Sequence, residues 1–223
     1  MKAARYMIDF LAESGVKHVF EMAGGAIAHL LDALDERDDI QAVAMHHEQA
    51  AAFAAEGYAR VNGNIGVAMA TSGPGALNLL TGIGSCYFDS VPCLFLTGQV
   101  NTFEYKFADK VRQNGFQETD IVNVAKPLVK YAAMVTDAAN LRYELEKAVF
   151  LCRSGRQGPV LLDIPMDVQR AEVVPERLDS YYASKEYALE LAGSPSGPAD
   201  ADIRQTIALL KKSTRPIVLV GEA

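Results

Sequence analysis

Positions 91–97 read VPCLFLT and positions 159–165 read PVLLDIP, two runs that are almost continuously apolar. A strand buried on both faces of a parallel sheet has this pattern, whereas a strand with one wet face alternates apolar and polar residues. We therefore expect both runs to form central strands of a parallel sheet.

Further β-rich runs, separated by helical or loop sequence, extend this pattern along the chain. Strands are expected over Val16–Phe20, Ile40–Met45, Gly66–Thr71, Pro92–Thr97, Leu128–Val135 and Pro159–Ile164. Ahead of them a helix is expected over Lys2–Ser14, where apolar residues recur every three or four positions before Gly15. Because strands that alternate with helices form a covered parallel sheet, the predicted fold class is α/β, a doubly wound parallel sheet flanked by helices.

The composition changes after residue 170. A charged, Tyr-rich passage ends in GSPSGP at 193–198, which cannot sustain the interior of a helix or strand. We expect one domain over 1–170, a linker over 171–199 and the start of a truncated central domain over 200–223. In that last part, the pattern predicts a helix over Asp200–Lys212 and a strand over Arg215–Gly221.

Charge and hydropathy restrict the class of protein. With 28 acidic and 21 basic residues, and no basic run, the chain is not expected to bind nucleic acid. No stretch approaches the roughly 20 apolar residues that cross a bilayer, and the N-terminus lacks the apolar core of a signal peptide, so a cytoplasmic protein without a membrane partner is expected. Cys86, Cys93 and Cys152 show no C-x-x-C spacing and are interpreted as reduced packing residues.

One segment places a carboxylate where α/β sheets bind ligands. Positions 46–60 read HHEQAAAFAAEGYAR, so Glu48 follows an expected strand and begins an expected helix. Taken alone, an acid that complements the helix dipole explains this position more simply. The adjacent histidines point apart and have no third ligand nearby, so no metal site is expected. The alanines of this helix would let another element or a flat ring approach closely.

A second segment, TSGPGALN at 71–78, also turns from a strand into a helix. Gly73 and Gly75 would let backbone amides come close to a ligand. A dinucleotide site is disfavoured, because Asn78 stands where a third glycine is needed and an apolar strand lies where the ribose-binding acid should be. Taken alone, a tight turn without a ligand remains an alternative explanation of the segment.

Together with other segments in the same order, these two resemble the acetolactate synthase and pyruvate oxidase family of thiamine diphosphate enzymes. The segments that carry the resemblance are Glu48, EGYAR at 56–60, Gly66, TSGPG at 71–75, DSVP at 89–92, TGQV at 97–100, FQETDI at 116–121, Lys126-Pro127 with Lys130, Gly155-Arg156, GPVLLDIP at 158–165 and DVQ at 167–169. The resemblance covers about residues 1–170, which is the whole first domain.

The resemblance implies the N-terminal pyrimidine-binding domain of an enzyme, a transferase or lyase that decarboxylates a 2-keto acid and carries out carboligation. Glu48 would be the catalytic residue, hydrogen-bonding N1′ of the aminopyrimidine ring and so activating the cofactor. The residues bordering that ring would be Ser72, Gly73, Pro74, Gly75 and Asn78, and those on the substrate side Gly24, Gly25, Ala26, His47, Phe116 and Gln117.

The resemblance also implies components outside this chain. Besides thiamine diphosphate, the family uses Mg²⁺, held by a domain whose Gly-Asp-Gly signature is absent here, and the missing central domain can hold FAD. The active site would be shared between subunits of a homo-oligomer, a dimer or a tetramer. The fragment alone is therefore expected to be inactive.

Two departures from the family pattern leave the substrate open. The usual Gly-x-Pro-Gly-Gly turn is here EMAGG at 21–25, and the loop at 101–115 is rich in Phe, Tyr, Lys and Arg. A related lyase or hydrolase acting on a sugar-derived or other ketone is therefore an alternative. A non-catalytic binding module of the same fold is another, which the presence of Glu48 disfavours.

Overall fold

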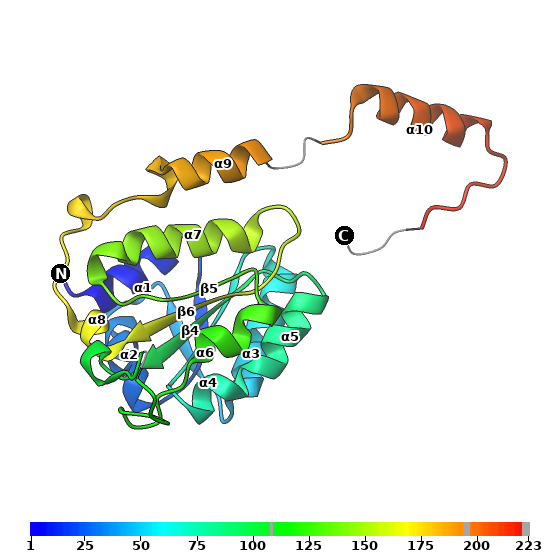
Figure 1. Ribbon diagram of the computed structural model, residues 1–223. Coiled ribbons are helices and arrows are strands. Elements are labelled where there is room, and N and C mark those ends of the chain that lie inside the picture. Colours follow the sequence, from blue (N-terminus) through cyan, green and yellow to red (C-terminus); the bar gives the residue numbers. More distant parts are fainter. Residues whose placement is uncertain (108, 194–196, 220–223) are drawn as a thin grey trace.

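The computed structural model describes residues 1–107, 109–193 and 197–219. Within these residues one six-stranded sheet has the order β2-β1-β3-β4-β6-β5, and all neighbouring strands are parallel (Figure 1). The strands are β1 (His18–Met22), β2 (Gln41–Ala44), β3 (Gly66–Ala70), β4 (Cys93–Gln99), β5 (Tyr131–Met134) and β6 (Val160–Pro165). The predicted parallel α/β fold is confirmed.

Different helices cover the two faces of the sheet (Figure 1). One face packs against α1 (Ala3–Glu13), α2 (Ala28–Asp35), α7 (Leu141–Arg153) and α8 (Met166–Arg170), the other against α3 (Glu48–Asn62), α4 (Pro74–Asn78), α5 (Leu80–Phe88) and α6 (Ile121–Ala125). Successive strand residues point to opposite faces, so Met69 joins the first core and Ala70 the second. Two apolar cores explain why the inner strands have no polar face.

The two runs chosen as central strands lie inside the sheet. β4 runs between β3 and β6, β6 runs between β4 and the edge strand β5, and every residue of both strands is buried. At the other end, β1 lies between β2 and β3, so the direction in which the sheet grows reverses beside β1. In doubly wound sheets, ligands bind outside the carboxyl ends of the strands at such a reversal.

The first strand begins two residues later than predicted, at His18 rather than Val16. The reason is the end of α1, where Gly15 adopts a left-handed φ of 83° and the Val16 amide donates to the Leu11 carbonyl at 3.0 Å. Val16 thus belongs to the helix C-cap. Met22 instead extends β1 and pairs with Ala70 of β3.

Residues 171–184 follow the surface of the first domain. Val173, Leu178 and Tyr181 are buried, and Glu172 forms an antiparallel bridge with Lys2. This stretch has 3₁₀ turns at Pro175–Arg177 and Tyr181–Ala183; the others are at Gly25–Ile27, Thr102–Glu104, Lys126–Leu128 and Ala138–Asn140. The predicted boundaries at 170 and 199 remain predictions.

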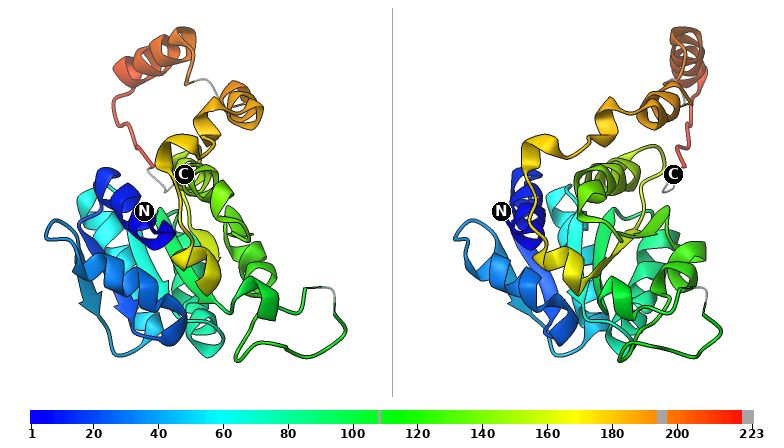
Figure 2. Two further views of the ribbon diagram at one scale, coloured as in Figure 1. Left: turned by 90° about the vertical axis from the view of Figure 1, so that its left-hand side faces the viewer. Right: turned by 60° about the vertical axis from the view of Figure 1, so that its left-hand side comes forward.

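Two helices extend beyond this stretch. α9 (Lys185–Gly193) lies along α7, where Glu186 pairs with Lys147 at 2.7 Å (Figure 1). The helix expected over Asp200–Lys212 is confirmed as α10, which has no buried residue and stands apart from the sheet and its helices (Figure 2).

The strand expected over 215–221 is not formed over 215–219, where the described backbone pairs with no other strand. An apolar run needs a neighbouring strand to satisfy its backbone groups, and propensity alone does not supply one. Val220 and Gly221 lie outside the described residues, as do Ser194–Ser196 of the expected linker.

Candidate active site

The helix that carries Glu48 begins where a capping side chain allows it to begin. His47 has extended backbone angles, and its Nδ1 accepts a hydrogen bond from the Gln49 amide at 3.1 Å. Such an N-cap satisfies one of the helix's unpaired amides. β2 ends at Ala44, so Glu48 lies just beyond the carboxyl end of an edge strand. His47, predicted on the substrate side, is exposed and caps this helix.

The alanines of α3 are used for packing between elements. Ala52 and Ala55 are fully buried. A Cβ on Gly82 of α5 would lie 2.3 Å from the Ala52 Cβ, and a Cβ on Gly66 of β3 would lie 2.0 Å from the Ala55 carbonyl oxygen. Of the two roles proposed for these alanines, the structure therefore shows the close approach of other elements.

The turn after β3 requires glycine for two reasons. Gly73 has a φ of 63°, and a Cβ there would lie 2.7 Å from the carbonyl oxygen of Gln117. Pro74 then occupies the first turn of α4, a position that needs no amide hydrogen. The tight turn thus brings Gln117, predicted on the substrate side, against Gly73.

Glu48 and Asn78, 30 residues apart, meet at this turn. The Asn78 Nδ2 donates to Glu48 Oε2 at 2.9 Å. A Cβ on Gly75 would lie 3.2 Å from Glu48 Oε1, so this oxygen lies directly over a buried glycine. Among the described residues no hydrogen bond to Oε1 is found. The half-buried carboxylate is therefore oriented through one oxygen, while the other can accept an external donor.

Thr71 joins the loops of the site, a role that was not predicted from the sequence. Its Oγ1 accepts a hydrogen bond from the Ala26 amide at 3.1 Å. A Cβ on Gly24 would lie 2.4 Å from the Thr71 Cβ, and one on Gly75 would lie 2.8 Å from its Cγ2. The signal was a β-branched hydroxyl residue directly after a strand end. Through Thr71, the predicted substrate-side loop touches the predicted cofactor-side turn.

The remaining predicted residues differ in exposure. Ser72 and Ala26 are buried, Gly25 and Pro74 are exposed, and Phe116 is 80% exposed. Gln117 has a φ of 58°, an uncommon value for a residue with a side chain. The structure therefore gathers Gly24, the 73–75 turn, Glu48, Asn78 and Gln117 at one edge, and it leaves Phe116 projecting from that edge.

Two further carboxyl groups near this edge are buried. Asp163, near the end of β6, accepts hydrogen bonds from Thr97 and Gln99, and its burial raises its pKa to about 7 despite them. Burial also raises the pKa of Glu21 in β1, whose Oε2 has no hydrogen-bond partner within the described part of the chain. Neither residue was assigned a role from sequence, because nothing in a one-dimensional pattern marks an acid as buried.

The three cysteines are buried and unpaired, which confirms their interpretation as packing residues. Within residues 1–107, 109–193 and 197–219, no group of three His, Cys, Asp or Glu side chains is arranged to hold a metal ion. In the same residues, no helix has both the length and the apolar character needed to span a membrane.

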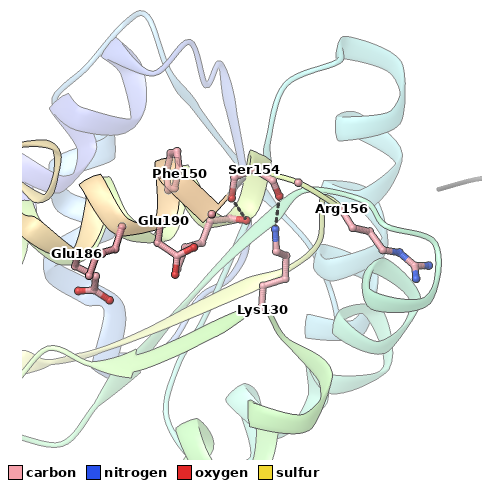
Figure 3. A pocket seen from close by; sticks show the side chains of 10 residues that line it. Lys130, Phe150, Ser154, Arg156, Glu186 and Glu190 are labelled. Atoms are coloured by element: carbon pink, nitrogen blue, oxygen red, sulfur yellow. Dashed lines mark hydrogen bonds between the residues drawn. The ribbon is translucent and has the colours of Figure 1, made fainter. Parts of the chain in front are cut away.

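A cavity of about 570 Å³ lies at the opposite edge of the sheet, between α7 and α9 (Figure 3). Lys130, which precedes β5, reaches across it and donates to the Ser154 carbonyl at 2.5 Å. Phe150, Glu186 and Glu190 line the same cavity. This hydrogen bond from Lys130 holds the chain that follows α7, so a structural explanation suffices for this lysine.

Similarity to known proteins extends over nearly the whole chain. Residues 1–124 match the family described as "Thiamine pyrophosphate enzyme, N-terminal TPP binding domain". Among similar proteins, chloroplastic acetolactate synthase of Arabidopsis thaliana is 38% identical over 224 residues, which are 99% of this chain and 31% of that protein.

Bacterial relatives show the same coverage. Acetolactate synthase of Arthrospira platensis is 38% identical over 96% of this chain and 36% of its own length. Acetolactate synthase isozyme 3 large subunit of Escherichia coli is 35% identical over 99% of this chain and 37% of its own length. The chain therefore spans about a third of the length of these relatives.

Proposed function

Because the chain belongs to the thiamine pyrophosphate enzyme family and carries its N-terminal TPP-binding domain, we propose that the Glu48 edge binds the aminopyrimidine ring of thiamine diphosphate. The observation that carries this proposal is the geometry of Glu48. One carboxylate oxygen is held by Asn78, and the other lies over Gly75 with no hydrogen-bond partner among the described residues.

The described residues fit a flat ring with polar edges. Gly75 lets the Glu48 carboxylate lie close to the backbone, where a Cβ would lie 2.8 Å from Thr71 Cγ2 and 3.2 Å from Glu48 Oε1. Glu48 and Asn78 place a carboxylate and an amide next to each other, as needed to share a proton with a ring nitrogen and to keep the carboxylate oriented. A ring bound here would be ordered by Glu48 and by the backbone of the 72–75 turn.

In this proposal the cofactor and the protein residues have separate chemical roles. When bound, thiamine diphosphate supplies a carbon centre that adds to a ketone and an electron sink for the carbanion left by decarboxylation. Glu48 holds a proton at the ring nitrogen, and Asn78 fixes its orientation. Thr71 keeps the Gly24 loop next to the 72–75 turn, which positions the predicted substrate side relative to the cofactor side.

For the whole protein we propose decarboxylation of a 2-keto acid followed by carboligation, because the similar proteins named above are acetolactate synthases. A related lyase or hydrolase acting on another ketone is the second candidate. The EMAGG turn favours it, since it begins at the buried Glu21, whose unpaired oxygen would alter the polarity near the substrate side.

We also propose that the active site is completed by another subunit. Large apolar side chains are exposed on the neighbouring helices α3, α4 and α5: Phe53, Leu77, Tyr87 and Phe88. A surface of this kind is typical of an interface. In this proposal Mg²⁺, the diphosphate group and any flavin are bound by other domains. Light scattering should find a dimer or tetramer of the full-length protein, and a strict monomer would contradict the shared site.

Turnover tests the proposed function directly. Full-length protein, supplied with thiamine diphosphate and Mg²⁺, should release CO₂ from a 2-keto acid and form a condensed product. A Glu48→Gln variant should lose at least about 10²-fold in rate, the scale for a positioned acid–base group. CO₂ release with an unchanged rate in that variant would remove Glu48 from the mechanism, and release without a condensed product would favour a simple lyase.

A further inference from the structure

We propose that Asp163 is a positioning residue for the candidate active site: through Gln99 it holds the main chain at Thr119, and with it the contact between Gln117 and Gly73. The catalytic importance of that contact rests on the proposed function. The positioning itself does not, because it follows from hydrogen bonds within this chain.

The first step is the burial of the Asp163 carboxyl group, which is fully enclosed near the end of β6. Its two oxygens accept from different donors, Thr97 Oγ1 at 2.7 Å and Gln99 Nε2 at 2.9 Å. Both donors lie on β4, the neighbouring strand. Among the described residues it forms no ion pair, so a buried carboxyl group is satisfied only by these two neutral donors.

The second step is the branching of Gln99, which is itself buried. The same Nε2 that donates to Asp163 also donates to the Thr119 carbonyl at 2.9 Å, and Oε1 accepts from the Val100 amide at 3.1 Å. All three polar positions of the amide are therefore used, and its orientation is fixed. Thr97 has no such contact with Thr119, so the two partners of Asp163 differ in what they hold.

The third step leads from Thr119 to the loop before it. The neighbouring Glu118 is buried, and its carboxylate accepts from the amides of Asn114 at 2.8 Å and Gly115 at 2.9 Å. One residue earlier, Gln117 presses its carbonyl oxygen and Cβ against Gly73. Holding Thr119 thus fixes a segment whose other side forms part of the candidate active site.

The strength of these hydrogen bonds depends on whether Asp163 is ionised. Burial raises its pKa to about 7, Thr97 and Gln99 lower it, and Asp120 raises it. Tyr105 also faces the group, and its own pKa is raised by burial first and then by nearby acids that include Asp163. An ionised carboxylate accepts a stronger hydrogen bond than a neutral acid, so the grip on Gln99 should strengthen as pH rises through about 7.

Hydrogen–deuterium exchange of the full chain tests this inference, read at the amides of Asn114 and Gly115 and corrected for intrinsic exchange. Gln99→Met should speed their exchange about 10-fold relative to the β3 amides, the scale for losing one hydrogen bond. Thr97→Val is the matched control, because it removes a bond to the same carboxyl group without releasing Thr119. It should leave the ratio of the exchange rates at Asn114 and Gly115 to those of the β3 amides within twofold of the wild-type value.

The pH profile separates positioning from general stability. In the wild type the ratio should fall as pH rises from 6 to 8, and Asp163→Asn should fold normally and abolish that change. Equal ratios in Gln99→Met and Thr97→Val, or an unchanged profile in Asp163→Asn, would overturn the inference. Repeating the series with thiamine diphosphate and Mg²⁺ tests the proposed function separately: no protection near Gly73 would count against the function and would not affect the positioning result.

Discussion

The amino and carboxyl ends of the parallel strands form two edges of the sheet, and these edges differ in how tightly they are packed. At the amino edge, a cavity of about 570 Å³ is lined by charged side chains such as Lys130 and Glu186 (Figure 3). At the carboxyl edge, Glu48 lies over Gly75 in a setting so closely packed that one added Cβ would collide with Thr71. Close backbone approach around an oriented carboxylate therefore distinguishes the carboxyl edge, and the cavity at the amino edge coincides with the contact that holds the end of α7.

The largest expected effect is the pH dependence of folding stability that Asp163 causes at the carboxyl edge. Asp163, at the carboxyl edge, has a folded-state pKa of about 7 against 3.8 for the free group. Between these values the folded protein holds a proton that the unfolded chain has released. This stabilisation is present below pH 4 and is lost as pH rises through 7, by at most about 4 kcal/mol.

Asp163→Asn should therefore gain stability over the wild type as pH rises, by up to about 4 kcal/mol at pH 8. Urea unfolding at pH 5 and pH 8 would measure the difference. Parallel profiles for the two proteins would show that Asp163 ionises as easily in the folded protein as in the unfolded chain.

A smaller effect is expected at Gly75. A Cβ there would lie 2.8 Å from the Thr71 Cγ2 and 3.2 Å from Glu48 Oε1, so Gly75→Ala should displace the carboxylate. We expect kcat/KM of the full-length protein to fall roughly 10²-fold, the scale for a misplacement of about 1 Å. Gly57→Ala in α3 is the control, because a Cβ there meets nothing within 4 Å. A control variant that loses activity equally would show that the close approach at Gly75 is unimportant.

The smallest effect is expected at the amino edge. Lys130→Met removes the hydrogen bond to the Ser154 carbonyl, and the free energy of unfolding should fall by about 1 kcal/mol. Because this contact is far from Glu48 along the strands, kcat/KM should stay within about twofold of the wild-type value. A loss of activity as large as that of Gly75→Ala would show that the cavity edge belongs to the site and would end the distinction between the two edges.

The sequence predicted the strands well because burial on two faces leaves a strong local signal. β4 and β6 read as apolar runs. The start of β1 was misplaced, since Val16 is drawn into the helix cap by Gly15. The start of β5 was also misplaced: it begins at Tyr131 rather than Leu128, which ends a 3₁₀ turn. The strand expected at 215–221 failed over its described part for the opposite reason. A strand needs a partner, and local propensity carries no information about one.

The candidate site was predicted where residue type alone suggests a role. The segments at 46–60 and 71–78 were expected to form one site, and the structure does bring Glu48 together with Gly75 and Asn78. Thr71, Gln99 and Asp163 were missed as supporting residues, because their importance depends on contacts between residues far apart in the sequence. Thr97 and Asp163, for example, are 66 residues apart. Such pairs become visible only when the order of the strands is known.

The exchange rate of the C2 hydrogen of bound thiamine diphosphate tests the central claim most directly, since it reports activation of the cofactor before any substrate binds. In the full-length protein, Glu48→Gln should slow this exchange by at least about 10²-fold without unfolding the domain. Glu56→Gln, which changes a buried carboxylate eight residues along the same helix that pairs with Arg60, should leave it unchanged. Exchange at the wild-type rate in Glu48→Gln would contradict the assignment of this edge as the pyrimidine site.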